Sequence, residues 1–232
     1  MDNTVVFEDF NDLPKNISLT KNNSSYVTID KIPEDLLEYS NKNYKKLYEL
    51  HPTNKHKIIM HNNEMQVNRY SKSYMNTPDM DNIINQNHSY MYSGFEKNVN
   101  DELPNEFVPY YDYFLTKNSN YNQAIVNWYD DGNDYIAYHS DCMIGLIENS
   151  SITMVNLNEN NDDRKIVFKA KNIIEEEDNF LVKKFEIPLI NGLVVEMNGK
   201  IQNEFRHGVP KLDINNDNFD KSRISISFRQ AL

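Results

Sequence analysis

Three residues that can bind a metal stand out in the second half of the chain. His139 and Asp141 lie two apart in DYIAYHSD, and His207 follows in NEFRHGVPK. Residues two apart in an extended segment project to the same side, so His139 and Asp141 can act together. Two imidazoles and one carboxylate form the facial ligand set that binds non-haem Fe(II) and leaves neighbouring positions open. The other histidines have no carboxylate at a useful spacing: His51, His56, His61 and His88.

The segment RISISFR carries an arginine at each end, Arg223 and Arg229. In a strand, both arginines share one face with Ser225 and Ser227, and three apolar residues face a core. A rise of ~3.3 Å per residue separates the arginine backbones by roughly 20 Å, and inward-leaning side chains leave a gap on the order of 7 Å. That gap suits a small dicarboxylate, because guanidinium groups bind carboxylates at each end. An edge strand with two solvated arginines is the open alternative.

The composition is that of a soluble globular domain with a sizeable core. Of 232 residues, 39% are hydrophobic and 25% are charged. No apolar run reaches the roughly 18–20 residues of a membrane span, and the start MDNTVVFEDFND lacks the apolar region of a secretory signal. The single cysteine, Cys142, fits a reducing compartment. We therefore expect an intracellular monomer, cytoplasmic or nuclear, that is neither secreted nor bound to a membrane.

The charge is unevenly distributed along the chain. A net charge of −11 argues against wrapping of nucleic acid over the whole surface. Residues 42–72, however, hold seven basic and two acidic residues, a net of +5 that leaves −16 for the rest. A local phosphate-binding face and a solvated lysine-rich helix explain this basic segment equally well.

Two helices are predicted before the main strands. Pro33 followed by EDLLEYSNKNYKKLYEL predicts the first, because Pro suits the first turn and the acidic residues favour the helix N-terminus. Pro104 opens the second, which extends to about Thr116. Residues 1–25 are expected to be irregular, and SYVTID is expected to form a short strand. Residues 51–100 are expected to be loop-rich, with short strands around MQVNRY and SYMYSG.

From Gln123 onward the pattern becomes that of a β protein. Seven strand candidates are separated by Asn, Asp and Gly turns: QAIVNWY, DYIAYHSD, SITMVNL, RKIVFKA, NFLVKKFEIPL, GLVVEM and RISISFR. No helical pattern intervenes, so a barrel or sandwich is predicted rather than alternating βαβ units.

The motifs taken together resemble the AlkB family of Fe(II)- and 2-oxoglutarate-dependent dioxygenases. The resemblance rests on Asn127-x-Tyr129, His139-x-Asp141, MNGKIQNEFRHGVPK and Arg223-x5-Arg229, in that order. Upstream, the residues around Arg69 and Tyr92-Ser93-Gly94 are similar to the nucleic-acid-repairing members. The resemblance covers about residues 26–232 and is strongest in the C-terminal half.

The resemblance implies an α+β, mainly β fold. Its parts would be an irregular extension at 1–25, N-terminal helices, a substrate lid at about 60–100 and a double-stranded β-helix (jelly roll) core at about 121–232. It also implies Fe(II) as cofactor and 2-oxoglutarate and O2 as cosubstrates. The metal ligands would be His139, Asp141 and His207.

Roles for the cosubstrate and substrate residues follow from the same resemblance. Arg223 would pair with the distal C5 carboxylate of 2-oxoglutarate and Arg229 would approach its C1 end. Asn127, Tyr129 and Ser225 would complete that site. On the substrate side, Tyr92 would clamp a flipped base against His139, and Arg69 and Lys72 would contact phosphate. A plain lid-core tyrosine is an equal alternative for Tyr92.

One departure from the family pattern concerns the substrate. Repair members carry an acidic residue shortly after the His-x-Asp, where this chain has Cys142 and Met143. That difference weakens the case for 1-methyladenine and 3-methylcytosine. The leading hypothesis is oxidative demethylation of N-alkylated bases in DNA or RNA, which would release formaldehyde, succinate and CO2. The alternative is the same chemistry on a protein or small molecule, and the intact ligand set opposes a catalytically dead binding module.

Overall fold

The computed structural model describes residues 4–6, 14–60, 63–75, 91–92, 95–96, 102–159, 164–171, 181–217 and 221–232. The helices within them are α1 (Glu34–Glu49), α3 (Val108–Lys117) and α4 (Ile201–Glu204). The strands of the first half are β1 (Thr4–Val6), β2 (Asn16–Ser18), β3 (Ser25–Lys31), β4 (Lys57–Met60), β5 (Asn63–Gln66), β6 (Tyr70–Met75), β7 (Met91–Tyr92) and β8 (Phe95–Glu96). Those of the second half are β9 (Gln123–Tyr129), β10 (Ile136–His139), β11 (Ile152–Leu157), β12 (Lys165–Ala170), β13 (Lys184–Pro188), β14 (Leu193–Gly199), β15 (Phe205–Val209) and β16 (Arg223–Arg229).

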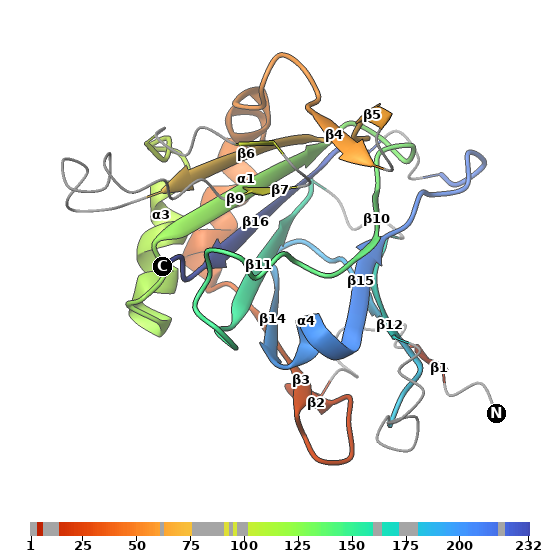
Figure 1. Cartoon of the computed structure of the whole chain (residues 1–232). Helices are drawn as coiled ribbons and strands as arrows, with labels where there is room; N and C mark the ends of the chain where they lie inside the picture. Colours follow the sequence, from red (N-terminus) through yellow and green to blue (C-terminus); the bar gives the residue numbers. More distant parts are fainter. Residues whose placement is uncertain are drawn as a thin grey trace.

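Two large sheets and a helical layer form the fold (Figure 1). One sheet has seven strands in the order β2-β3-β14-β11-β16-β9-β6, and the other has five in the order β1-β13-β12-β15-β10. Val27, Val195 and Phe168 belong to the apolar core between the sheets. Leu47 of α1 and Phe114 of α3 pack on the other face of the seven-stranded sheet. The fold is thus mainly β and consistent with a jelly-roll sandwich. None of the helices in the described ranges combines the length and apolarity that crossing a bilayer requires.

The first helix lies where the sequence predicts it. α1 begins at Glu34, directly after Pro33, and has Glu34 and Asp35 in its first turn, where the helix dipole favours negative charge. α3 begins at Val108, later than predicted, because residues 104–107 form a turn in which the Phe107 N–H bonds the Pro104 carbonyl at 2.8 Å.

The structure differs from the expected strands in two places. Residues 1–25 are not wholly irregular, because β1 pairs in parallel with β13 and β2 pairs with β3. β15 (FRHGV) was not among the predicted strands, since its Arg, His and Gly residues obscure the apolar alternation. It nevertheless pairs with both β10 and β12 and carries His207. Much of the expected lid (61–62, 76–90, 93–94 and 97–100) lies outside the described residues.

β16 is an interior strand of the seven-stranded sheet. It pairs with β11 on one side and β9 on the other, so its arginines do not lie on an edge strand. The alternative of two solvated arginines at a sheet edge is therefore wrong. Every residue of β16 is buried, which leaves the polar face of the strand directed into the protein interior.

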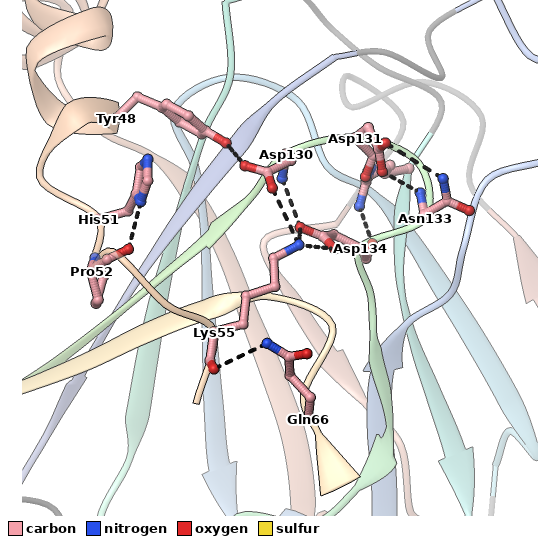
Figure 2. A network of polar contacts seen from close by, with 10 residues as sticks. Tyr48, His51, Pro52, Lys55, Gln66, Asp130, Asp131, Asn133 and Asp134 are labelled. Carbon is pink, nitrogen blue, oxygen red and sulfur yellow. Dashed lines mark hydrogen bonds and ion pairs between the residues drawn. The ribbon is translucent and has the colours of Figure 1, made fainter. Parts of the chain in front are cut away.

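A polar network joins the end of α1 to the turn between β9 and β10 (Figure 2). The Lys55 ammonium group donates to both carboxylate oxygens of Asp134, at 2.6 and 2.7 Å, and lies 3.2 Å from the Asp130 carboxylate. The hydroxyl of Tyr48 also donates to Asp130. This turn leads into β10, which ends at His139, so the network holds the strand that delivers the first candidate metal ligand.

The network lowers the pKa of Asp130 and raises the pKa of Lys55. Burial alone would raise the pKa of Asp130, but hydrogen bonds from Tyr48 and Lys55 hold that pKa below its usual value. Burial alone would lower the pKa of Lys55, yet Asp134 and Asp130 raise it. The Asp130 contribution to stability is therefore present above the unfolded-state pKa of about 3.9 and lost as pH falls through the lowered value. The Lys55 contribution is present below about pH 10 and lost as pH rises through the raised value.

Replacing Lys55 by methionine is expected to lower the free energy of unfolding by about 1–3 kcal/mol at neutral pH, because the buried Asp134 carboxylate loses its cation. Urea denaturation from pH 3 to 11 measures the free energy of unfolding of both proteins. The difference between the variant and the unsubstituted protein should become smaller at both ends of this pH range. Lys57→Met is the matched control, since Lys57 pairs with Glu64 on an exposed surface. Equal losses in the two variants would contradict a special role for the network.

Candidate active site

A cavity between the two sheets collects the polar face of β16. Arg223, Ser225, Ser227 and Arg229 all line it, whereas Ile224, Ile226 and Phe228 on the opposite face join the core beneath the helices. The two-residue alternation of RISISFR thus separates cavity from core as predicted. β9 contributes to the same wall, because Tyr129 is paired with Arg223 and Asn127 with Ser225.

The three candidate metal ligands meet in this cavity. Their donor atoms all lie within 4.8 Å of one another. The Asp141 carboxylate lies between the histidines, with His139 Nε2 3.6 Å from Oδ1 and His207 Nε2 3.6 Å from Oδ2. Two donors at about 2.1 Å from one ion can be up to about 4.2 Å apart, so one ion can bridge each of these pairs. The geometry fits an iron site with two imidazoles and one carboxylate.

Strand pairing explains why His139 and His207 meet although they are distant in sequence. β10 and β15 run antiparallel, and His139 is paired directly with His207 across an irregular register. The strands approach closely at Gly208, where an added Cβ would lie 2.8 Å from the carbonyl oxygen of Ile136. Any larger residue at Gly208 would push the two histidine-bearing strands apart.

The environment keeps both histidines suited to metal binding. Burial, with the neighbouring His139, lowers the pKa of His207 to about 3, so its imidazole is neutral and has a free lone pair. His139 Nδ1 lies 2.9 Å from the carbonyl oxygen of Ala137, where it can donate only as N–H. In a neutral imidazole with this tautomer, Nε2 is the nitrogen that carries the lone pair, and it is directed toward Asp141 as a metal ligand would be.

Asp141 is held as a carboxylate despite being buried. Burial alone would raise the pKa of its carboxyl group, but Arg229, His139 and His207 hold that pKa well below its usual range. Arg229 Nη2 donates to Asp141 Oδ1 at 2.8 Å. The expectation that Arg229 approaches the C1 end of 2-oxoglutarate remains a prediction, and its contact with Asp141 places it beside the metal ligands.

The guanidinium group of Arg223 is positioned to bind an anion. Its side chain is fully buried, its Cζ lies 3.8 Å from the centroid of the Tyr129 ring, and Nη1 donates to Asn156 Oδ1 at 3.1 Å. Its Nε and Nη2 are buried with no acceptor among the described residues. No carboxylate in those residues forms an ion pair with it. A buried guanidinium with two such N–H groups fits the distal carboxylate of a diacid such as 2-oxoglutarate.

The position of Arg69 differs from the expected one, in which it would contact phosphate at the start of a lid. It is only 5% exposed, it lines the same cavity, and its Nε donates to Asn127 Oδ1 at 3.1 Å. Lys72 is half-buried in β6, with its ammonium group 5.4 Å from the centroid of the Tyr74 ring. The backbone of Tyr92 lies in β7, but its side chain lies outside the described residues.

Met143 does not reach the metal cavity. It packs against the core between the sheets and lines a separate pocket beside α4. Met143, one of the two residues at which the resemblance would place an acid, is therefore directed away from the cavity. Cys142 is half-buried and carries a free thiol.

Several residues that shape the site carried no sequence signal of their own. Asn156 orients Arg223, Gln202 contacts Asp141, and Gly208 allows the close approach of β10 and β15. Each acts through a partner far away in sequence. Gly208 alone offered a clue, because a glycine inside a strand often marks a close approach of backbones.

The comparison with known families agrees with this geometry. A family profile described as the 2OG-Fe(II) oxygenase superfamily matches residues 35–229, which include all three candidate metal ligands and both arginines of β16. No curated protein matches the chain closely enough to name a relative. Because the match spans most of the sequence, and the cavity offers both a His-Asp-His iron site and a buried arginine for a diacid, the chain belongs to the 2OG-Fe(II) oxygenase superfamily.

Proposed function

We propose that this dioxygenase removes methyl groups from the nitrogen atoms of alkylated bases in DNA or RNA. As a superfamily member it uses Fe(II), 2-oxoglutarate and O2. The bound iron supplies the oxidation of an unactivated C–H bond while 2-oxoglutarate is converted to succinate and CO2. One atom of O2 enters succinate and the other hydroxylates the methyl group, whose carbon then leaves as formaldehyde and restores the base.

The residues of the chain hold and orient the reactants. His139, Asp141 and His207 would hold the iron, and Arg223 would bind the C5 carboxylate of 2-oxoglutarate. Apolar side chains from both sheets line the cavity and limit the entry of water, among them Ile125, Met154 and Ile166. A dry cavity strengthens each charge interaction and protects a reactive intermediate from side reactions.

The observation that carries the nucleic-acid proposal is a group of cations beside the metal site. We call Tyr138, Lys169, Lys171 and Arg206 the basic cluster. Lys169 and Arg206 are paired across β12 and β15, although like charges placed opposite each other destabilise a sheet. The Lys169 ammonium group lies 3.8 Å from the centroid of the Tyr138 ring, which is 37% exposed. Among the described residues no carboxylate pairs with Lys169, Lys171 or Arg206. Cations and an exposed ring suit a phosphate backbone and an unstacked base.

The position of the basic cluster is compatible with a strand whose base enters the cavity. Tyr138 directly precedes His139, and Arg206 directly precedes His207. Because side chains alternate along a strand, the cluster faces away from the cavity. β10, however, is the edge strand of the five-stranded sheet, so a flexible chain can pass from the cavity over this edge onto the cluster. The proposed contacts of the basic cluster are with phosphate groups. Such contacts position a substrate without reading its sequence.

The test is demethylation of a panel of methylated oligonucleotides. The protein is loaded with Fe(II) and 2-oxoglutarate without air, exposed to air, and analysed by mass spectrometry for loss of one methylene mass and by formaldehyde release. Lys169→Ala and Arg206→Ala should each reduce the salt dependence of oligonucleotide binding by about one unit of slope. Lys183→Ala, which changes an exposed lysine outside the cluster, is the control. Turnover with unchanged salt slopes would remove the cluster from the binding surface.

A protein or small-molecule substrate is the second candidate. It is favoured by the ion pairs and the burial of basic side chains within residues 42–72. Three lysines of residues 42–72 pair with acids: Lys45 with Glu49, Lys57 with Glu64, and Lys55 with Asp130 and Asp134. Arg69 is buried in the cavity wall. Four of the seven basic residues of the segment are thus paired or buried, while Lys42 and Lys46 of α1 remain exposed. If no methylated oligonucleotide were turned over while a peptide stimulated conversion of 2-oxoglutarate, this second candidate would replace the first.

A further inference from the structure

We infer that Gln202 is a positioning residue for the metal-binding carboxylate of Asp141. The Asp141 N–H donates to Gln202 Oε1 at 2.8 Å, and Gln202 Nε2 in turn donates to Asp141 Oδ2 at 3.3 Å. Both residues are buried. One side chain thus contacts the backbone and the carboxylate of the same residue. The inference rests on the iron site and not on the proposed nucleic-acid substrate.

The orientation of the Gln202 amide follows from the groups that it meets. The Asp141 N–H is a donor and needs an acceptor, which only the carbonyl oxygen of the amide provides. That choice turns the amide NH2 toward the carboxylate, where it donates. The NH2 also lies 3.6 Å from Met197 Sδ, a weak acceptor on β14. Reversing the amide would place two donors together and leave the carboxylate facing an oxygen, so a single orientation satisfies every contact.

Gln202 is held on a firmly anchored turn. It lies in α4, whose preceding residue Lys200 donates its N–H to the Ser24 carbonyl at 2.8 Å. The Lys171 ammonium group donates to the Gln202 carbonyl at 2.7 Å. At the end of α4, the carboxylate of Glu204 accepts hydrogen bonds from the hydroxyls of Ser24 and Ser25. A side chain on so fixed a backbone can hold its partner in one conformation.

This arrangement links the two parts of the iron site. α4 leads directly into β15, which carries His207, whereas Asp141 follows β10, which carries His139. Gln202 therefore connects the strand of the third ligand to the second ligand. Arg229 holds Oδ1 of Asp141 while Gln202 holds Oδ2, so the plane of the carboxylate is set from both sides. Partners of this kind orient a ligand and raise metal affinity.

The experiment measures metal binding alone, with no substrate. Mn(II) is titrated into the protein without 2-oxoglutarate, and free Mn(II) is followed by electron paramagnetic resonance. Gln202→Met keeps the length of the side chain but removes both polar groups. We expect the affinity for Mn(II) to fall about 10-fold to 100-fold. The absorption spectrum of the Co(II)-loaded variant should also shift, because the carboxylate is then held at Oδ1 alone.

Asn203→Ala is the matched control, since Asn203 is an exposed residue of the same helix. Its Mn(II) affinity should equal that of the unsubstituted protein. Should Gln202→Met fail to fold, Gln202→Asn keeps the amide but is too short to reach both groups, and the same loss is expected. An affinity within twofold of the unsubstituted protein, with an unchanged Co(II) spectrum, would overturn the inference. Because no nucleic acid is present, that result would leave the proposed function standing.

Discussion

Replacing His207 by alanine is expected to abolish turnover. The imidazole is one of three donors that lie within 4.8 Å of one another. The other two, from His139 and Asp141, come from residues two apart at the end of β10. Substitution of a residue that only supports a ligand costs about 10-fold to 100-fold in metal affinity, so loss of the ligand itself should cost more than about 100-fold. Conversion of 2-oxoglutarate to succinate, measured at saturating cosubstrate, should fall by at least that factor. Mn(II) titration of the same variant should show the loss of affinity directly.

A histidine outside the cavity provides the control. His51 lies after α1, where its Nδ1 is 2.8 Å from the Pro52 carbonyl oxygen and its ring packs 4.3 Å from that of Tyr70. His51→Ala should retain both metal affinity and turnover. The unfolding temperature of each variant separates loss of metal from loss of fold. Turnover by His207→Ala above a tenth of the normal rate would show that His207 is not an iron ligand.

The second large effect is expected at Arg223. Replacing it by methionine should raise the KM for 2-oxoglutarate far more than it lowers kcat, because the substitution removes the buried cation that we assign to the C5 carboxylate. Truncating one member of a buried, hydrogen-bonded charge pair costs about 2–5 kcal/mol, which corresponds to roughly 30-fold to 5,000-fold. Succinate formation over a range of 2-oxoglutarate concentrations measures the change.

Thermal unfolding gives an independent reading of the same role. Without 2-oxoglutarate, Arg223 buries a charge whose Nε and Nη2 lack acceptors among the described residues. Removing that charge should therefore cost little stability and can even increase it. Added 2-oxoglutarate should raise the unfolding temperature of the unsubstituted protein but not that of Arg223→Met.

Ile226→Val tests whether disturbance of β16 alone explains the result. Ile226 lies on the same strand but on the face that packs beneath the helices. Its truncation should lower the free energy of unfolding by about 0.5–1.5 kcal/mol and leave the KM unchanged. A KM for Arg223→Met within threefold of normal would mean that another group binds the distal carboxylate.

The two sheets carry different parts of the site. The seven-stranded sheet carries the arginines of β16 and Asn127 and Tyr129 of β9, which are the residues assigned to the cosubstrate. The five-stranded sheet carries His139 and His207, the imidazole ligands. The reaction therefore takes place where the sheets face each other, and any change in their separation alters the distance between cosubstrate and metal.

Local patterns in the sequence predicted the parts of this protein that depend on near neighbours. The alternation of RISISFR assigned Arg223 and Arg229 to one face because side chains along a strand alternate with a period of two. Pro33 and the acidic residues after it located the start of α1 for an equally local reason. The spacing of His139 and Asp141, with His207 downstream, indicated the ligand set because ligand chemistry is a property of residue type.

The tertiary structure alone decided which distant residues meet. Gln202 reaches Asp141 and Asn156 reaches Arg223 across more than sixty positions, through strand registers that no short pattern encodes. β15 was not predicted because its arginine, histidine and glycine hide the alternation, although it pairs with β10 on one side and β12 on the other. Arg69 faces the cavity instead of open solvent because β6 pairs with β9. Register and sheet packing are set by the burial of apolar surface over the whole chain, and they become visible only when the chain is folded.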